Sequence, residues 1–151
     1  MEAVLLSLHV VAGILFVGPV AVTTSLFPRY VPVNAAAPAD NRVPRSRDTA
    51  NLLHRITRVY GALALAVPVI GIALAIVQGR TTEVWVVVAM VLTAIAGGLL
   101  IMQIAPRQRD ALDRPGDGSH LRRLSMLTGI FNLLWAIVVV LMIVRPGSSS
   151  T

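Results

Sequence analysis

The feature that most constrains this chain is an apolar run, residues 4–27, which holds 24 residues and no formally charged side chain. An α-helix of that length extends for about 36 Å, because each residue adds about 1.5 Å. It crosses a hydrocarbon layer of about 30 Å with some tilt. A cleaved signal peptide carries a basic segment before a shorter apolar core. Glu2 is the only charged side chain before Arg29, so we expect an uncleaved first membrane span.

The composition supports three further spans. Hydrophobic residues make up 56% of the 151 residues and charged residues 13%, whereas a soluble domain carries about 25% charged residues. We therefore predict an all-α fold: a four-helix bundle in the membrane, with one domain over residues 1–151 built from two out–in–out helical hairpins. The expected spans are residues 4–27, 59–78, 84–105 and 124–144, the loops are residues 28–58 and 106–123, and the disordered tail is residues 146–151.

The arginines predict the orientation of the bundle, since all 13 basic residues are arginine. Eleven lie in residues 28–58 and 106–123, and two, Arg80 and Arg145, lie on the opposite side. Cytoplasmic loops of membrane proteins carry the excess of basic residues. We therefore expect both arginine-rich loops in the cytoplasm and both termini outside, in a multi-pass protein of a bacterial inner (cell) membrane. The net charge of +6 suits anionic lipid headgroups better than nucleic acid, because the charges flank apolar runs.

Prolines and hydroxyl residues predict local irregularities in the first two spans. Pro19 and Pro68 lie inside apolar runs, and proline removes one helical hydrogen bond and clashes with the preceding turn. A kink is expected near each. Thr23, Thr24 and Ser25 are expected to bond to main-chain carbonyls one turn earlier, which lets them lie in a span at modest cost.

The two halves of the chain are similar in sequence. Phe-Pro-Arg closes the first apolar run at residues 27–29, and Ala-Pro-Arg closes the third at residues 105–107. The starts of spans two and four also align, with LHRITRVYG at residues 53–61 and LRRLSMLTG at residues 121–129. An internal duplication would relate the hairpins by an axis along the membrane normal. The alternative is coincidence, since arginines are common at cytoplasmic boundaries.

His9 is the only ionisable side chain well inside an apolar run, and such residues commonly mark function. It is a candidate for cofactor binding, because neutral imidazole can ligate haem or a metal, or relay protons. The alternative is a histidine that hydrogen-bonds a neighbouring helix. His54 and His120 are expected at the opposite boundary, where neither can pair with His9 across one porphyrin. With no cysteine and no carboxylate inside a span, we predict no catalytic residue, no metal site and no bound cofactor.

Other polar residues are candidates for contacts with partner subunits or headgroups. Arg55 and Arg58 are three residues apart, so they share one helix face. With Arg122 and Arg123 they can form a basic rim for a phosphate, a propionate or an acidic loop. The alternative for these arginines is anchoring in lipid headgroups. Asn132 is expected to bond to another helix, because an unpaired amide is costly in hydrocarbon.

The segment LHVVAGILFVGP, residues 8–19, has a histidine early in the span and a Val-Gly pair after it. It resembles small four-span bacterial membrane proteins of actinobacterial type, which look distantly similar to copper-resistance D and protoporphyrinogen oxidase J proteins. Of the oxidase's catalytic pattern, the resemblance extends to His9 alone. Small polytopic proteins of this type also occur as accessory subunits of the cytochrome bcc–aa3 respiratory supercomplex.

Three functions are therefore open. The first is a non-catalytic accessory or assembly subunit of a larger membrane complex, such as a respiratory oxidase supercomplex, with lipid and other membrane subunits as its partners. The second is a small haem- or metal-handling membrane enzyme centred on His9. The third is a small-solute transporter that acts as an oligomer.

Overall fold

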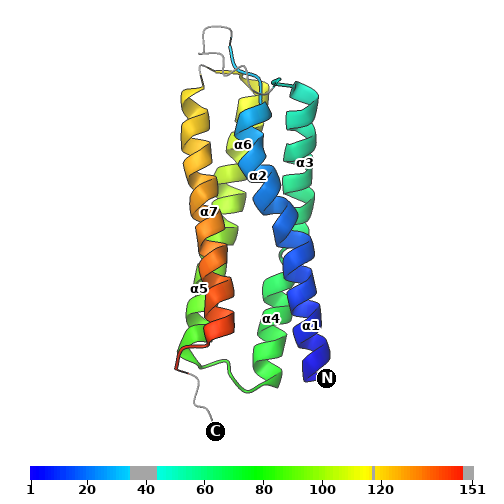
Figure 1. Cartoon of the computed structure of the whole chain (residues 1–151), viewed down its shortest axis with the longest axis vertical. Coiled ribbons are helices and arrows are strands. Elements are labelled where there is room, and N and C mark those ends of the chain that lie inside the picture. The colour runs from blue at the N-terminus through cyan, green and yellow to red at the C-terminus, as the bar shows by residue number, and fades with distance from the viewer. Residues whose placement is uncertain (35–43, 117, 148–151) are drawn as a thin grey trace.

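Four long helical rods pack as a bundle in the computed structural model, which describes residues 1–34, 44–116 and 118–147 (Figure 1). The rods are Glu2–Tyr30, Arg47–Val77, Val84–Asp113 and Ser119–Val144, and each is long and apolar enough to cross a membrane. This confirms the predicted all-α four-helix membrane bundle. The start of the first rod and the end of the fourth lie at one end, here called the terminal end. The second and fourth rods begin, at Arg47 and Ser119, at the other, here called the loop end.

The first rod deviates from an α-helix just before Pro19, as predicted. It consists of α1 (Glu2–Ala12), a π-helical turn η1 (Gly13–Val17) and α2 (Gly18–Tyr30), with Pro19 in the first turn of α2. In a π turn a carbonyl accepts from the N–H five residues ahead rather than four. A carbonyl that would otherwise face proline, which has no N–H, can therefore pair with the next residue. The Oγ atoms of Thr23, Thr24 and Ser25 donate to carbonyls four residues earlier at 2.9, 2.7 and 2.7 Å.

The second rod is interrupted one turn before Pro68. It consists of α3 (Arg47–Leu63) and α4 (Ala66–Val77), separated by a turn. Pro68 has no N–H to offer the carbonyl of Ala64, so that carbonyl accepts from the Val67 N–H instead, at 3.1 Å. The missing proline donor explains why the helix tightens and restarts here.

The rods extend beyond the apolar runs at the loop end. The start of α3 lies inside residues 28–58, which hydropathy assigns to a loop, because Ser46 Oγ caps the helix by accepting from Thr49 N–H at 3.4 Å. The third rod continues through Pro106, which lies in the first turn of its last segment, where a helix needs no N–H. It consists of α5 (Val84–Leu99), η2 (Leu100–Ile104) and α6 (Ala105–Asp113), and the fourth rod is α7 (Ser119–Val144).

The main core lies in the loop-end half of the bundle. Its largest fully buried apolar side chains include Phe27, Ile104 and Leu124, from three different rods. At the terminal end the rods are associated in pairs, with α1 against α4 and α5 against α7 (Figure 1). A smaller cluster of Ala75, Trp85 and Val86 is buried there. The core therefore joins the rods most extensively near the loop end.

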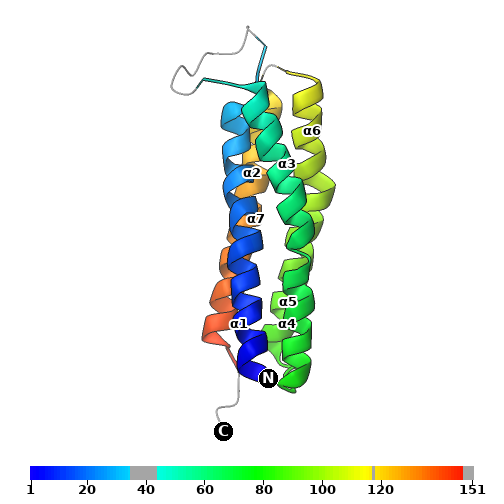
Figure 2. The same ribbon diagram turned by 90° about the vertical axis from the view of Figure 1, so that its right-hand side faces the viewer.

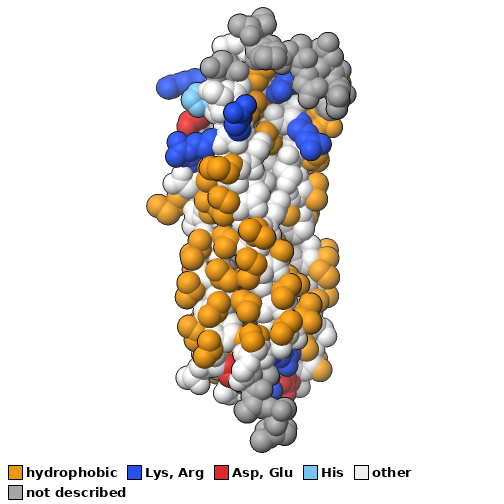
Figure 3. Space-filling model, turned by 60° about the vertical axis from the view of Figure 1, so that its left-hand side comes forward, with side chains coloured by type: hydrophobic (Ala, Val, Ile, Leu, Met, Phe, Trp, Pro, Cys, Tyr) orange, Lys and Arg blue, Asp and Glu red, His pale blue; other side chains and the backbone are white. Residues whose placement is uncertain are grey.

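Most apolar side chains face outward. In the most apolar stretch of each rod, between 17% and 28% of the residues are buried. Figure 3 shows a broad hydrophobic band between charged side chains at the two ends of the molecule. A surface of this kind suits contact with lipid rather than water. The chain is a multi-pass membrane protein.

The aligned halves differ in environment. Thr57 is buried and bonds to Thr23, whereas its counterpart Ser125 is exposed and bonds to its own helix. A Cβ at Gly61 would lie 3.1 Å from Leu100, whereas one at Gly129 would meet nothing within 4 Å. An internal duplication stays a prediction. Of the predicted disordered tail, residues 148–151 lie outside the described residues, and residues 146–147 form a turn.

Candidate functional site

His9 is buried between α1 and α4. Its Nδ1 lies 3.1 Å from the carbonyl oxygen of Val67, and because a carbonyl only accepts, Nδ1 carries the proton. A Cβ at Gly71 would lie 2.8 Å from Cε1 of His9, so the imidazole fits against α4 only because residue 71 is glycine. The histidine thus makes the interhelical hydrogen bond that is the alternative to a cofactor role.

Other potential ligands lie far along the rods from His9. His9 is about two turns from the start of α1 at the terminal end, whereas His54 and His120 lie on the loop-end parts of α3 and α7. Within residues 1–34, 44–116 and 118–147, no group of three or more metal-binding side chains comes together. Haem or metal binding at His9 stays a prediction.

The four predicted rim arginines are all exposed at the loop end, on two rods. Arg55 and Arg58 lie on α3, which packs against α2 and α6, and Arg122 and Arg123 lie on α7, which packs against α2 and α5. Among the described residues, no hydrogen bond or ion pair joins one pair to the other. A shared ligand for all four stays a prediction. Arg58 lines a cavity that does not include the other three.

That cavity is a groove of about 430 Å³ between α3 and the η2–α6 part of the third rod. Its volume falls within the range of roughly 300–1,000 Å³ that is usual for small-ligand sites. The side chains nearest the loop end are polar, and those deeper along the rods are apolar. The polar members are His54, Thr57, Arg58 and Arg109, the deeper members are Gly61, Ala62, Leu65, Leu100 and Ile101, and Ala105 and Pro106 lie between Ile101 and Arg109 on the third rod.

The groove has a basic mouth whose charges are weakly engaged. Arg58 has no hydrogen bond or ion pair with any described residue. Arg109 Nε lies 3.9 Å from Asp113 Oδ2, and both side chains are mostly exposed, so this pair contributes little. His54 is fixed, since its Nδ1 donates to Gln108 Oε1 at 3.0 Å and its ring packs edge-on to Phe27. Both arginines are therefore available to an anion.

Arg109 is not among the residues that the sequence predicts for a site. The groove-lining residues of α3 are 54, 57, 58, 61 and 62, which is the spacing of one helix face, and residue 65 follows in the turn before α4. Residues 101, 105 and 109 of the facing rod are four apart and change from apolar to basic in the same direction. This change from apolar to basic along each helix can be recognised in the sequence. That the two helix faces lie opposite each other cannot, because it depends on how each rod is rotated about its axis.

Asn132 lies on α7 and bonds to α2. Its Nδ2 donates to Ser25 Oγ at 3.0 Å, and Ser25 Oγ donates to the carbonyl of Ala21 at 2.7 Å. Asn132 Oδ1 is occluded and has no hydrogen-bond partner among the described residues. Gly129, one turn earlier, is exposed. Asn132 makes the interhelical bond that its place in a span requires, while its role as a partner contact stays a prediction.

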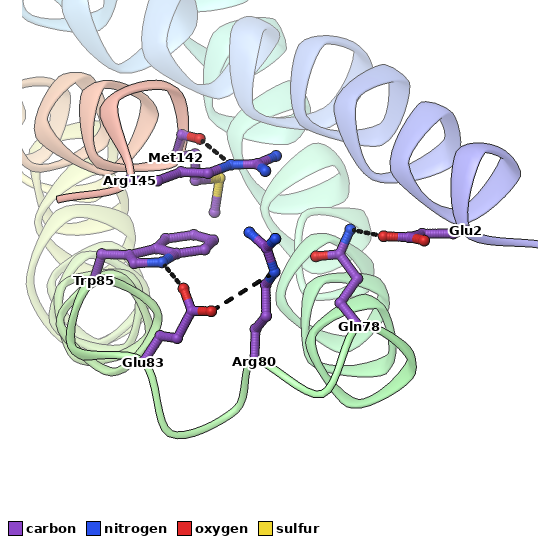
Figure 4. Close-up of polar contacts among 7 residues, drawn as sticks. All are labelled: Glu2, Gln78, Arg80, Glu83, Trp85, Met142 and Arg145. Carbon is purple, nitrogen blue, oxygen red and sulfur yellow. Dashed lines mark hydrogen bonds and ion pairs between the residues drawn. The ribbon is translucent and has the colours of Figure 1, made fainter. Parts of the chain in front are cut away.

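Polar side chains from all four rods meet at the terminal end (Figure 4). Both arginines on this side of the bundle are engaged there, one with a carboxylate and one with an aromatic ring. The contacts are Gln78 Nε2 donating to Glu2 Oε1 at 2.6 Å, Arg80 Nε 3.6 Å from Glu83 Oε1, Trp85 Nε1 donating to Glu83, and the Arg145 guanidinium 5.7 Å from the centre of the Trp85 ring. Glu83 and Trp85 thus link Arg80 to Arg145, while the Glu2–Gln78 pair joins the first rod to the end of the second.

No protein-family model, curated protein or solved structure matches this chain. The resemblance to four-span bacterial proteins therefore identifies no family.

Proposed function

We propose that this protein is a non-catalytic accessory or assembly subunit that packs against transmembrane helices of a larger membrane complex. The contact surface would be the α2–α7 face, defined as Ser25, Ser125, Gly129, Asn132 and Ala136. The observation that carries the proposal is the Asn132–Ser25 pair at this surface, well inside the apolar part of α7. Polar groups are costly against hydrocarbon, whereas between helices they stabilise association.

The spacing of the α2–α7 face supports helix packing. Ser125, Gly129, Asn132 and Ala136 follow one another at intervals of four, three and four residues, so they share one side of α7. Figure 1 shows α2, which carries Ser25, beside α7. Small residues allow two helix backbones to approach closely in a membrane. This face therefore combines small side chains, which let another helix come close, with hydrogen-bonding groups.

Gly129 gives the most specific support. Glycine inside a helix costs about 1 kcal/mol relative to alanine. A Cβ at Gly129 would meet nothing within 4 Å, so packing within this chain does not require glycine there. The close approach of another helix is a physical reason for that glycine.

A respiratory oxidase complex is the first partner to test, because small polytopic proteins of this type occur as accessory subunits of such complexes. The tagged protein would be extracted from its native membrane in a mild detergent. Copurifying subunits would be identified by mass spectrometry, and haem by a visible spectrum. We expect membrane subunits, and haem contributed by them, to copurify with the wild-type protein.

Variants of the contact surface give the decisive comparison. Gly129→Leu and Asn132→Leu should each lower partner recovery at least tenfold. Gly129→Leu should do so with little change in the melting temperature of the isolated protein, because a side chain at position 129 starts in open space, whereas Asn132→Leu also removes the bond to Ser25. Ile130→Phe is the matched control, since residue 130 is also exposed but points about 100° away around α7. The proposal is wrong if the wild-type protein copurifies with no partner, or if the control variant loses the partner equally.

A further inference from the structure

We propose that the groove between α3 and the η2–α6 part of the third rod binds one acidic phospholipid. The phosphate would lie at Arg58 and Arg109, and one acyl chain would run along the apolar interior toward Leu65 and Ile101. This site is separate from the α2–α7 face, because other helices form it. It holds whether or not the protein is a subunit of a larger complex.

The mouth of the groove has the chemistry of a phosphate site. Arg58 on α3 and Arg109 on α6 contribute from opposite walls, and Figure 2 shows these helices side by side at the loop end. Guanidinium groups bind phosphate oxygens through paired, charge-assisted hydrogen bonds. Arg58 is unpaired within the described parts of the chain, and the long Arg109–Asp113 contact is easily exchanged. Two arginines thus line the mouth of one groove.

The interior of the groove suits a hydrocarbon chain. Ala62 and Leu65 line one wall, and Leu100 and Ile101 line the other. Leu65 and Ile101 are 54% and 56% exposed, so the groove opens sideways to the surface that faces lipid. The molecules that can enter from that side are lipids, and their chains gain dispersion contacts with the walls.

The charge at the mouth selects the class of lipid. An acyl chain gains no hydrophobic free energy on moving from bilayer to groove, so discrimination between lipids must come from the headgroup. Each arginine near the surface favours an anionic lipid by about fivefold. A zwitterionic lipid such as phosphatidylcholine carries a positively charged ammonium group, which is repelled by the same two arginines. Acidic phospholipid is therefore the expected occupant.

Native mass spectrometry of the full chain, released from nanodiscs, tests the site. The nanodiscs would contain equal amounts of phosphatidylglycerol and phosphatidylcholine with the same acyl chains. We expect one retained phosphatidylglycerol per chain, with little phosphatidylcholine. Arg58→Gln and Arg109→Gln should each lower this preference about fivefold, and the double variant should remove it. Excess inorganic phosphate should not displace the lipid, because phosphate lacks the chain.

A second variant tests the chain-binding part of the groove. Ala62→Phe should fill the interior and lower phosphatidylglycerol retention, while Ala73→Phe, at an exposed alanine outside the groove, should not. Arg114→Gln is the charge-matched control, since Arg114 is exposed five residues beyond Arg109 and does not line the groove. Melting temperatures would verify that each variant is folded.

Four results would overturn the proposal. They are equal retention of both lipids, an undiminished preference in the Arg58→Gln, Arg109→Gln double variant, a loss in Arg114→Gln as large as in Arg109→Gln, and unchanged retention in Ala62→Phe. The third would indicate general surface attraction. The fourth would indicate that the headgroup binds without a chain in the groove.

Discussion

The imidazole of His9 rests directly on the backbone of Gly71, where a Cβ would come within 2.8 Å of Cε1. The same ring donates to the carbonyl of Val67, so one side chain links α1 to α4 by a hydrogen bond and by close packing. This contact lies on the α1–α4 pair of the terminal half, away from the main core. His9 therefore has a structural role that needs no cofactor.

The first prediction concerns this contact. Gly71→Ala should destabilise the protein by about 1–3 kcal/mol, because an inserted methyl group forces a well-packed side chain to move. The measurement is thermal or denaturant unfolding in detergent. Gly97→Ala is the control, since a Cβ at Gly97 would meet nothing within 4 Å, and it should be neutral or stabilising.

A double-variant cycle separates the clash from a general effect of alanine. With His9→Ala already present, Gly71→Ala should cost much less than it does alone, because the ring that it strikes is gone. Equal costs in the two backgrounds would show that His9 and Gly71 are not coupled.

The second prediction concerns the hydrogen bond between Thr23 and Thr57, whose Oγ1 atoms lie 2.9 Å apart between α2 and α3. Thr57→Val keeps the shape of the side chain and removes the hydroxyl. We expect a loss of about 0.6–1.7 kcal/mol, the usual range for a hydrogen bond between membrane helices. Ser125→Ala removes an exposed hydroxyl that bonds to its own helix, and it should change stability by less than about 0.5 kcal/mol. If both variants lower the stability equally, the buried hydroxyl of Thr57 contributes no more to stability than the exposed hydroxyl of Ser125.

The third prediction concerns Arg145, which packs over Trp85 at the end of α7. Arg145→Gln removes the cation and should weaken the last turn of α7 by about 0.5–1 kcal/mol. Hydrogen exchange of that turn should then be about two- to fivefold faster. Arg145→Lys keeps a cation and should exchange closer to the wild-type rate. If both variants behave alike, the contact with the ring contributes nothing to that turn.

The sequence predicts the rods and their irregularities because both depend on local chemistry. Long apolar runs bounded by arginine mark the spans, and the prolines at 19 and 68 coincide with departures from the α-helix. The α-helical start of the second rod at Arg47 is not visible to hydropathy, because its first turns are polar. A cap and an amphipathic face support that helix, and neither depends on mean hydropathy.

The candidate sites are less predictable because they depend on how the rods are rotated and paired. Arg55 and Arg58 share a helix face in any helix, yet Arg58 alone of the two lines the groove, and it does so opposite Arg109. Likewise, a glycine is needed at position 71 because His9, on another rod, packs against its backbone. Spacing within one helix is a local property, whereas the facing of two helices is set by packing of the whole bundle.

The last prediction concerns orientation, which the distribution of arginines predicts and the bundle geometry makes testable. The chain has no cysteine, so single introduced thiols can be labelled without background. Thr82 lies in the exposed turn at the terminal end, and Arg114 is exposed at the loop end. In intact cells a membrane-impermeant maleimide should label Thr82→Cys, whereas Arg114→Cys should react only after the membrane is opened. Because the start of α1 and the end of α7 share the end of Thr82, the opposite labelling pattern would place both of them on the cytoplasmic side. The acidic lipid of the groove would then have to come from the outer leaflet.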